Sequence, residues 1–142
     1  MNSPSQHDPM AALNEVLSEV IDVVMALAQA HRKVSETHQL HAELDQLFSD
    51  AKTWAELLVE ADTARGVSAL DFMPSVAGRQ RSSMWQGRAS DDEVRKVLLQ
   101  QLSRLSEHVS VALSAQDDDR VRDLLDRISA ELQSHLETLT TP

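Results

Sequence analysis

The sequence predicts an all-α protein, an antiparallel four-helix bundle in which two long helical arms flank an irregular connector at residues 65–90. All three glycines of the chain, and its only proline between residues 10 and 141, lie inside that connector. Glycine and proline are the residues that a helix interior tolerates least. Aromatic residues make up only 3% of the chain, so the core must consist of aliphatic side chains, which favours helices over a sheet sandwich. A chain of 142 residues is expected to form one domain, 1–142.

The first helix is expected at about residues 9–34, after a frayed stretch at 1–8. Asp8 followed by Pro9 is typical of an N-cap with proline at the first helical position. From there an apolar stripe follows alternating spacings of three and four, which places its members on one face of a helix. The stripe consists of Leu13, Leu17, Val20, Val24, Leu27, His31 and Val34.

A second helix is expected at about 36–64, because the apolar stripe resumes there out of phase by one residue. Acids such as Glu19 lie early in the first helix and bases lie late, as the helix macrodipole favours. Ser35 and Glu36 then restart that pattern with a cap and an early acid. We therefore favour two helices over one bent helix. Gly66 is placed to end the second helix.

The third helix is expected at about 91–114 and the fourth at about 118–140. Ser90 and Glu93 form a capping box, in which the serine side chain accepts the N–H of residue 93. Asp117–Asp119 crowd three carboxylates where the next helix N-terminus carries a partial positive charge. The expected buried faces carry Val94, Leu98, Leu102, Leu105, Val109 and Ala112, then Val121, Leu125, Ile128, Leu132, His135 and Leu139.

The chain is strongly acidic, with a formal net charge of −10. This charge repels a phosphate backbone and an anionic bilayer, so neither nucleic acid nor a membrane is expected as a partner. There is no cysteine, which excludes disulfides and thiolate metal sites. The first ten residues lack the basic and apolar regions of a signal peptide, and no stretch reaches the roughly 18 apolar residues of a membrane span. We therefore expect a cytoplasmic protein.

The connector differs from the helical arms in charge and composition. It carries four arginines against the single acid Asp71. One interpretation is that these arginines fold back onto the acidic helices. The other is a docking loop, because Trp, Met and Arg are enriched at the cores of protein interfaces. The candidate partner-binding residues are Phe72, Met73, Arg79, Arg81, Met84, Trp85 and Arg88.

Four histidines form a candidate metal or haem site. His31, His38 and His41 lie within eleven residues of each other. In an up-down-up-down bundle the end of the third helix would bring His108 to the same pole, and imidazole suits zinc, copper, iron or haem. Glu-x-x-His pairs are absent, which disfavours a carboxylate-bridged di-metal centre. The alternative is that these histidines are hydrated polar residues without a ligand.

The stretch His38-Gln39-Leu40-His41-Ala42 resembles the surround of the phosphorylated histidine in histidine phosphotransfer domains. Those domains are acidic four-helix bundles, and the resemblance implies that His38 is a phosphoacceptor. His41 stands where that family has a lysine, and Ala42 where it has a glycine.

Catalysis is not expected from the sequence, because glycine-rich phosphate loops, nucleophile elbows and cysteines are absent. The main functional prediction is a non-enzymatic adaptor, chaperone-like or regulatory protein without a cofactor. Its partner would be another protein or a second copy of the chain in a homodimer. The alternatives are a metal- or haem-binding bundle and a phosphotransfer domain.

Overall fold

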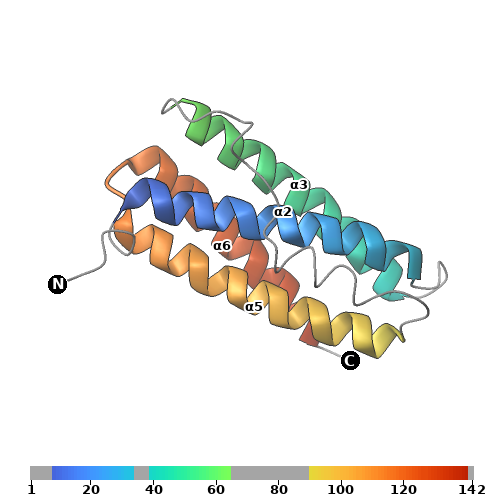
Figure 1. Ribbon diagram of the computed structural model, residues 1–142. Helices are drawn as coiled ribbons and strands as arrows, with labels where there is room; N and C mark the ends of the chain where they lie inside the picture. The colour runs from blue at the N-terminus through green and yellow to red at the C-terminus, as the bar shows by residue number, and fades with distance from the viewer. Residues whose placement is uncertain (1–7, 34–38, 65–89, 141–142) are drawn as a thin grey trace.

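The computed structural model describes residues 8–33, 39–64 and 90–140, apart from the side chains of residues 31–33 and 39. The described residues form four α-helices and contain no strand. The predicted all-α four-helix bundle is therefore confirmed (Figure 1). The helices are α2 (Pro9–Lys33), α3 (Gln39–Thr63), α5 (Asp91–Ala115) and α6 (Asp119–Thr140). α2 and α3 are separate helices, so the favoured two-helix interpretation of the first arm agrees with the structure.

Three helices begin at side-chain caps that the sequence indicates. The carboxylate of Asp8 accepts the N–H of Met10 at 3.0 Å at the start of α2. The hydroxyl of Ser90 accepts the N–H of Glu93 at 3.1 Å at the start of α5. Asp118 caps α6 by accepting the N–H of Arg120 at 2.8 Å. Each cap satisfies a backbone donor that the first helical turn leaves without a partner, which fixes where the helix starts.

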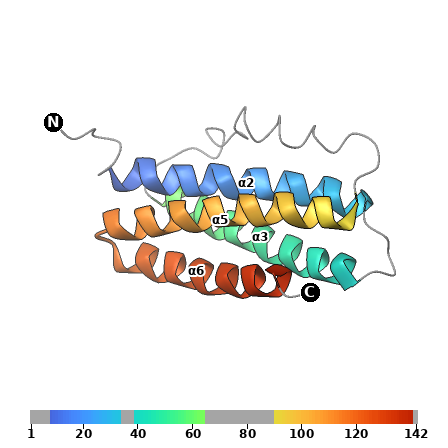
Figure 2. The same cartoon turned by 90° about the horizontal axis from the view of Figure 1, so that it is seen from below.

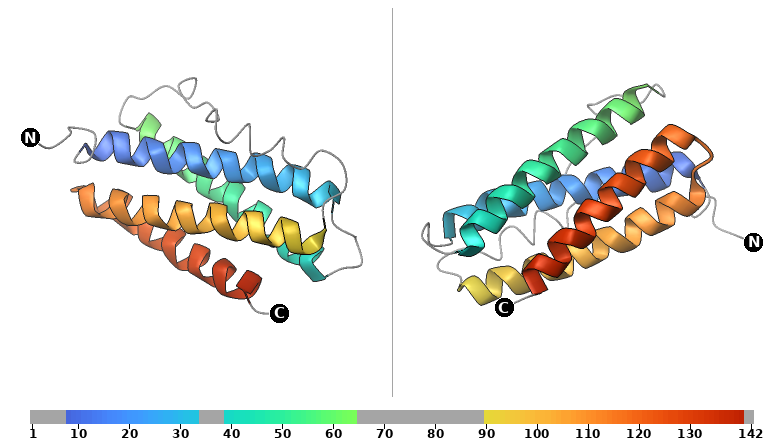
Figure 3. Two further views of the ribbon diagram at one scale, coloured as in Figure 1. Left: turned by 60° about the horizontal axis from the view of Figure 1, so that its bottom comes forward. Right: turned by 180° about the vertical axis from the view of Figure 1, so that it is seen from behind.

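The helix directions define the topology of the bundle. α2 runs antiparallel to α3 and α5, and α6 also runs antiparallel to both, so α3 and α5 point the same way (Figures 1 and 2). α3 and α6 form one side of the bundle (Figure 3), and their contact is the least extensive of the four neighbouring pairs. A hydrogen bond of 2.8 Å from Gln116 Nε2 to the carbonyl of Pro9 joins the end of α5 to the start of α2. This bond sets the register in which α2 and α5 face each other.

The core is aliphatic, as the composition predicts. Trp54 on α3 is the largest side chain in it and is completely buried. Burying one Leu, Ile or Val side chain contributes about 1.5–3 kcal/mol, so the stripes of the four helices supply the main driving force for folding. Fully buried members include Leu13, Leu17, Leu27, Leu44, Leu58, Leu98, Leu102, Leu105, Leu125 and Leu132. No described helix has an apolar stretch of the length that a membrane span requires.

Candidate metal-binding site between α2 and α5

The predicted histidine cluster does not form as a single group among the described residues. His41 lies near the start of α3, with Nδ1 3.5 Å from a carboxylate oxygen of Asp45 on the same helix. His108 lies seventeen residues after the start of α5, about 25 Å along its axis. α3 and α5 start at the same pole because they are parallel, so His108 is far from His41. The prediction that His108 joins the other histidines assumed the opposite direction for α5. His38 and the side chain of His31 lie outside the described residues.

His108 instead faces a carboxylate across the α2–α5 interface. Its Nδ1 atom lies 3.9 Å from Oε2 of Glu19. The Glu19 side chain is 10% exposed and the His108 side chain 33% exposed. His108 Nδ1 is itself shielded from solvent and makes no hydrogen bond in the structure. A separation of 3.9 Å exceeds the range of a hydrogen bond, so the two groups are close but not directly bonded.

Glu19 is the residue of this pair that sequence reasoning missed. The sequence analysis explained the carboxylate of Glu19 by the helix macrodipole. The first turn of α2 contains no acid, however, and Glu19 lies in the middle of the helix. The signal that identifies it is its phase. Ala12 and Ala26 lie seven residues on either side, on the same stripe, and both are buried. A carboxylate in a buried stripe needs a counter-charge, a hydrogen bond or a metal ion.

A second histidine–carboxylate pair crosses the bundle between α3 and α6. Nε2 of His135 lies 2.6 Å from Oδ2 of Asp50, and both side chains are largely buried. The other oxygen of Asp50 accepts an amide N–H from Gln46 at 3.1 Å. This pair is a direct hydrogen bond, and it leaves no space for an ion between its atoms.

Trp54 extends the α3–α6 contact by one turn. Its indole N–H donates to Oε1 of Glu131 at 3.2 Å, while Oε2 of Glu131 accepts from Arg127 at 2.9 Å. The rings of Trp54 and His135 meet edge to face, with centroids 6.2 Å apart. Both oxygens of Glu131 therefore accept a hydrogen bond. The network as a whole holds α3 and α6 together.

The residues present fit a metal ion only in part. Within the described ranges, no group of three or more His, Asp or Glu residues is placed to hold an ion. The Glu19–His108 pair supplies one imidazole nitrogen and one carboxylate oxygen, both of which suit first-row transition metals. Metal bonds to these atoms are about 2.0–2.2 Å long, so two atoms that are 3.9 Å apart would meet one ion at an angle of about 140°, and a regular tetrahedral site needs them about 0.5 Å closer. The pair thus provides two ligands, and water would complete the coordination.

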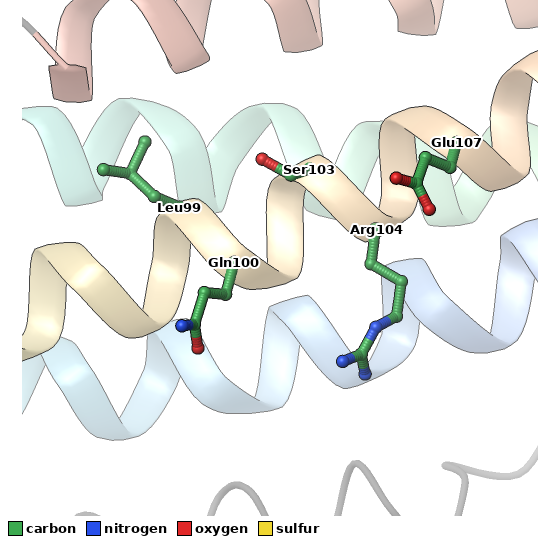
Figure 4. A pocket seen from close by; sticks show the side chains of 5 residues that line it. All are labelled: Leu99, Gln100, Ser103, Arg104 and Glu107. Atoms are coloured by element: carbon green, nitrogen blue, oxygen red, sulfur yellow. The ribbon is translucent and has the colours of Figure 1, made fainter.

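A hollow on the outer face of α5 lies close to this site in sequence (Figure 4). Arg104 and Glu107 bring opposite charges to it. All the described residues that line it come from α5. Its lining residues are Leu99, Gln100, Ser103, Arg104 and Glu107.

The other candidate sites cannot be located in the described part of the chain. The predicted partner-binding residues from Phe72 to Arg88 lie outside it, and so does the predicted phosphoacceptor His38. Both assignments stay predictions.

Comparison with known proteins identifies the architecture. No family model matches the chain, and no curated protein matches it. Among solved structures, a mutant of Dps1 from Mycobacterium smegmatis superimposes with a TM-score of 0.74 over 99% of this chain and 97% of that chain, at 18% sequence identity. That protein is a ferritin-like four-helix bundle. At this level of identity the likeness shows a shared fold.

This likeness corrects two functional predictions from the sequence. The main prediction of a non-enzymatic adaptor, chaperone-like or regulatory protein was wrong, because the match is to a metal-binding type of bundle. The prediction that the chain is not an enzyme was wrong for the same reason. The alternative of a metal-binding bundle agrees better with the match. The sequence pointed away from a di-metal centre because it lacks the Glu-x-x-His pairs by which di-metal bundles are recognised.

Proposed function

We propose that this chain is a ferritin-like metal-handling protein that takes up a divalent transition-metal ion between Glu19 and His108. The observation that carries the proposal is the 3.9 Å gap between Glu19 Oε2 and His108 Nδ1. The gap is too long for a hydrogen bond, and a shift of about 0.5 Å in either side chain would bring the two atoms to the spacing of two ligands on one tetrahedral ion.

The position of His108 suits a ligand. Its Nδ1 atom is shielded from solvent and makes no hydrogen bond, and a buried polar atom without a partner lowers stability. The same side chain is one-third exposed, so the pair lies near the surface of the bundle. His108 would bind the ion through Nδ1, and Glu19 would supply the compensating negative charge.

The charge of the protein supports a cationic ligand. The net charge of −10 raises the local concentration of cations near the surface. Two carboxylates on neighbouring turns of α2, Glu19 and Asp22, are buried at 8% and 1% exposure. A bound cation would offset part of the cost of keeping them out of water.

Iron is the metal that the fold favours, because ferritin-like bundles are the scaffold of di-iron carboxylate proteins. The reaction that follows by analogy of fold is the oxidation of ferrous iron by dioxygen. Each ferrous ion gives up one electron, and four such electrons with four protons reduce dioxygen to two water molecules. Iron is here the substrate, and the Glu19–His108 pair holds it in place.

Metal titration of tag-free protein tests the proposal. Co²⁺ is added without oxygen as a spectroscopic probe, and Fe²⁺ binding is measured by equilibrium dialysis. The expected result is visible absorption from Co²⁺ bound to nitrogen and oxygen ligands, and saturable uptake of Fe²⁺. His108→Ala and Glu19→Gln should each weaken binding by tenfold or more, since loss of even an outer-shell partner typically costs about 10–100-fold.

His135→Gln is the matched control. His135 is also a partly buried histidine facing a carboxylate across two helices, but its pair is closed at 2.6 Å. This variant should keep wild-type metal binding. If wild-type protein takes up neither metal, or if His108→Ala binds as tightly as wild type, the site is not the one described. Consumption of oxygen on addition of Fe²⁺ in air separately tests the reaction.

A further inference from the structure

α2 is covered more completely than the other three described helices. Within Pro9–Ala30, the part of α2 whose side chains the structure describes, Glu15 is the only exposed residue. α3, α5 and α6 each keep exposed residues on the side away from the core, such as Glu56, Lys96 and Asp126. A helix at the surface of a bundle normally has such an exposed polar face. α2 lacks one.

The other described helices do not cover α2 on every side. α2 packs against α3 and α5, and α6 lies on the opposite side of the bundle (Figure 2). Ser18 is two positions from Val20, and Met25 is two positions from Val23, which corresponds to about 200° around the helix. Both valines are completely buried, so Ser18 and Met25 lie on the side away from the core. We call this side the outer face of α2, and it consists of the half-buried residues Asn14, Ser18, Ile21 and Met25.

The chain between α3 and α5 has to pass along the whole bundle. α3 and α5 are parallel, so α3 ends at the pole opposite to the start of α5 (Figures 1 and 2). Residues 65–89, which lie outside the described residues, join these two ends. α2 has 25 residues and is about 37 Å long, whereas a segment of this length spans up to about 85 Å when extended. The segment is therefore long enough to follow α2 from one pole to the other.

The composition of segment 65–89 suits the outer face of α2. The segment contains Phe72, Met73 and Trp85, and aromatic residues and methionine are enriched where surfaces pack together. Ile21 and Met25 offer apolar groups on the outer face. Burial of these groups against each other removes apolar surface from water, which is the main driving force for such a contact.

The charge of the segment favours the same contact. Asp22 follows Ile21 at the edge of the outer face and is 1% exposed. A carboxylate that is so deeply buried needs a cation or hydrogen-bond donors close to it. Segment 65–89 carries four arginines and one acid, and the planar guanidinium group binds carboxylates through two parallel hydrogen bonds. The segment thus brings positive charge to a helix that buries negative charge.

We propose that residues 65–89 dock along the outer face of α2 and cover it. The apolar side chains of the segment pack on Ile21 and Met25, and the face is a contact within one chain, not a surface for a second copy. The arginine-rich segment is then bound to its own bundle, as one of the two interpretations of its sequence holds. This proposal does not depend on metal binding at Glu19 and His108.

Photo-cross-linking of the full-length protein tests the proposal. Met25 is replaced by the photoreactive residue benzoylphenylalanine, the protein is irradiated, and the cross-linked peptides are identified by mass spectrometry. The expected product is a cross-link within one chain to a peptide from residues 65–89. Ser18 is replaced in the same way in a second variant, and circular dichroism shows which variants keep the helical fold. Ala130 is the matched control, since it is exposed on α6, and it should give no cross-link to that segment.

Two outcomes would overturn the proposal. A cross-link between two chains, seen as a dimer on a denaturing gel, would show that a second copy covers α2. Cross-links to residues 65–89 that are no more frequent from Met25 and Ser18 than from Ala130 would show that the segment does not lie on this face. Neither outcome would affect the proposed metal site, which the Co²⁺ titration tests separately.

Discussion

The two sides of the bundle hold the same pair of chemical groups in different ways. Between α3 and α6, His135 and Asp50 are in direct hydrogen-bond contact at 2.6 Å. Between α2 and α5, His108 and Glu19 stand 3.9 Å apart, with the histidine nitrogen unsatisfied. A histidine and a carboxylate therefore hold two helices together where their atoms are hydrogen-bonded, and they are candidate ligands where the atoms are separated.

The surroundings explain this difference. The α3–α6 contact is the least extensive of the four neighbouring pairs, and it is reinforced by polar bonds that include the buried indole of Trp54. The α2–α5 contact is more extensive than the α3–α6 contact, so these helices pack together without a bond between Glu19 and His108. The α3–α6 contact depends on its polar pair, whereas the α2–α5 contact does not depend on a bond between Glu19 and His108.

Replacement of Trp54 by Ala should have the largest effect on the α3–α6 side. The change removes a fully buried ring and its bond to Glu131. We expect a loss of about 3–5 kcal/mol in the free energy of unfolding, measured by urea denaturation and circular dichroism. A loss below about 1 kcal/mol would mean that this side does not depend on these contacts.

The His135–Asp50 bond should show coupling in a double-mutant cycle. His135→Ala leaves the carboxylate of Asp50 largely buried without its histidine, and Asp50→Ala leaves the imidazole in the same state. Each should lower the free energy of unfolding by about 1–3 kcal/mol. The double variant should lose less than the sum of the two losses. Additive losses would contradict a direct bond.

The same cycle on the α2–α5 side should give the opposite result without metal. Glu19→Gln and His108→Ala should be nearly additive in urea unfolding of metal-free protein, because their atoms are not bonded. With Co²⁺ present the two losses should no longer add, because the ion raises the stability of the wild type and each single replacement removes that gain. Strong coupling without metal would mean that Glu19 and His108 are directly bonded, as His135 and Asp50 are.

Ser90→Ala should have the smallest effect on stability, because Ser90 belongs to neither histidine–carboxylate pair. It removes the cap that accepts the N–H of Glu93 at the start of α5, at a cost of about 1 kcal/mol. Metal binding should be unchanged, because His108 lies far along the helix. A loss of Co²⁺ binding in this variant would show that the site depends on the end of α5.

The sequence predicts the helices because their signals are local. The confinement of glycine and proline, the apolar stripes and the caps at Asp8 and Ser90 act within a few residues of where they occur. The four-helix fold follows from them. The candidate site does not, because its two members are on helices far apart in sequence.

The amino-acid sequence by itself determined that this chain is an acidic, aliphatic bundle of helices with definite starts. Only the tertiary structure decided that α3 and α5 are parallel, and with that which histidine meets which carboxylate. The physical reason is that apolar stripes pack in either direction with similar burial of surface. The choice of direction, and the gap between Glu19 and His108, depend on contacts across the whole bundle.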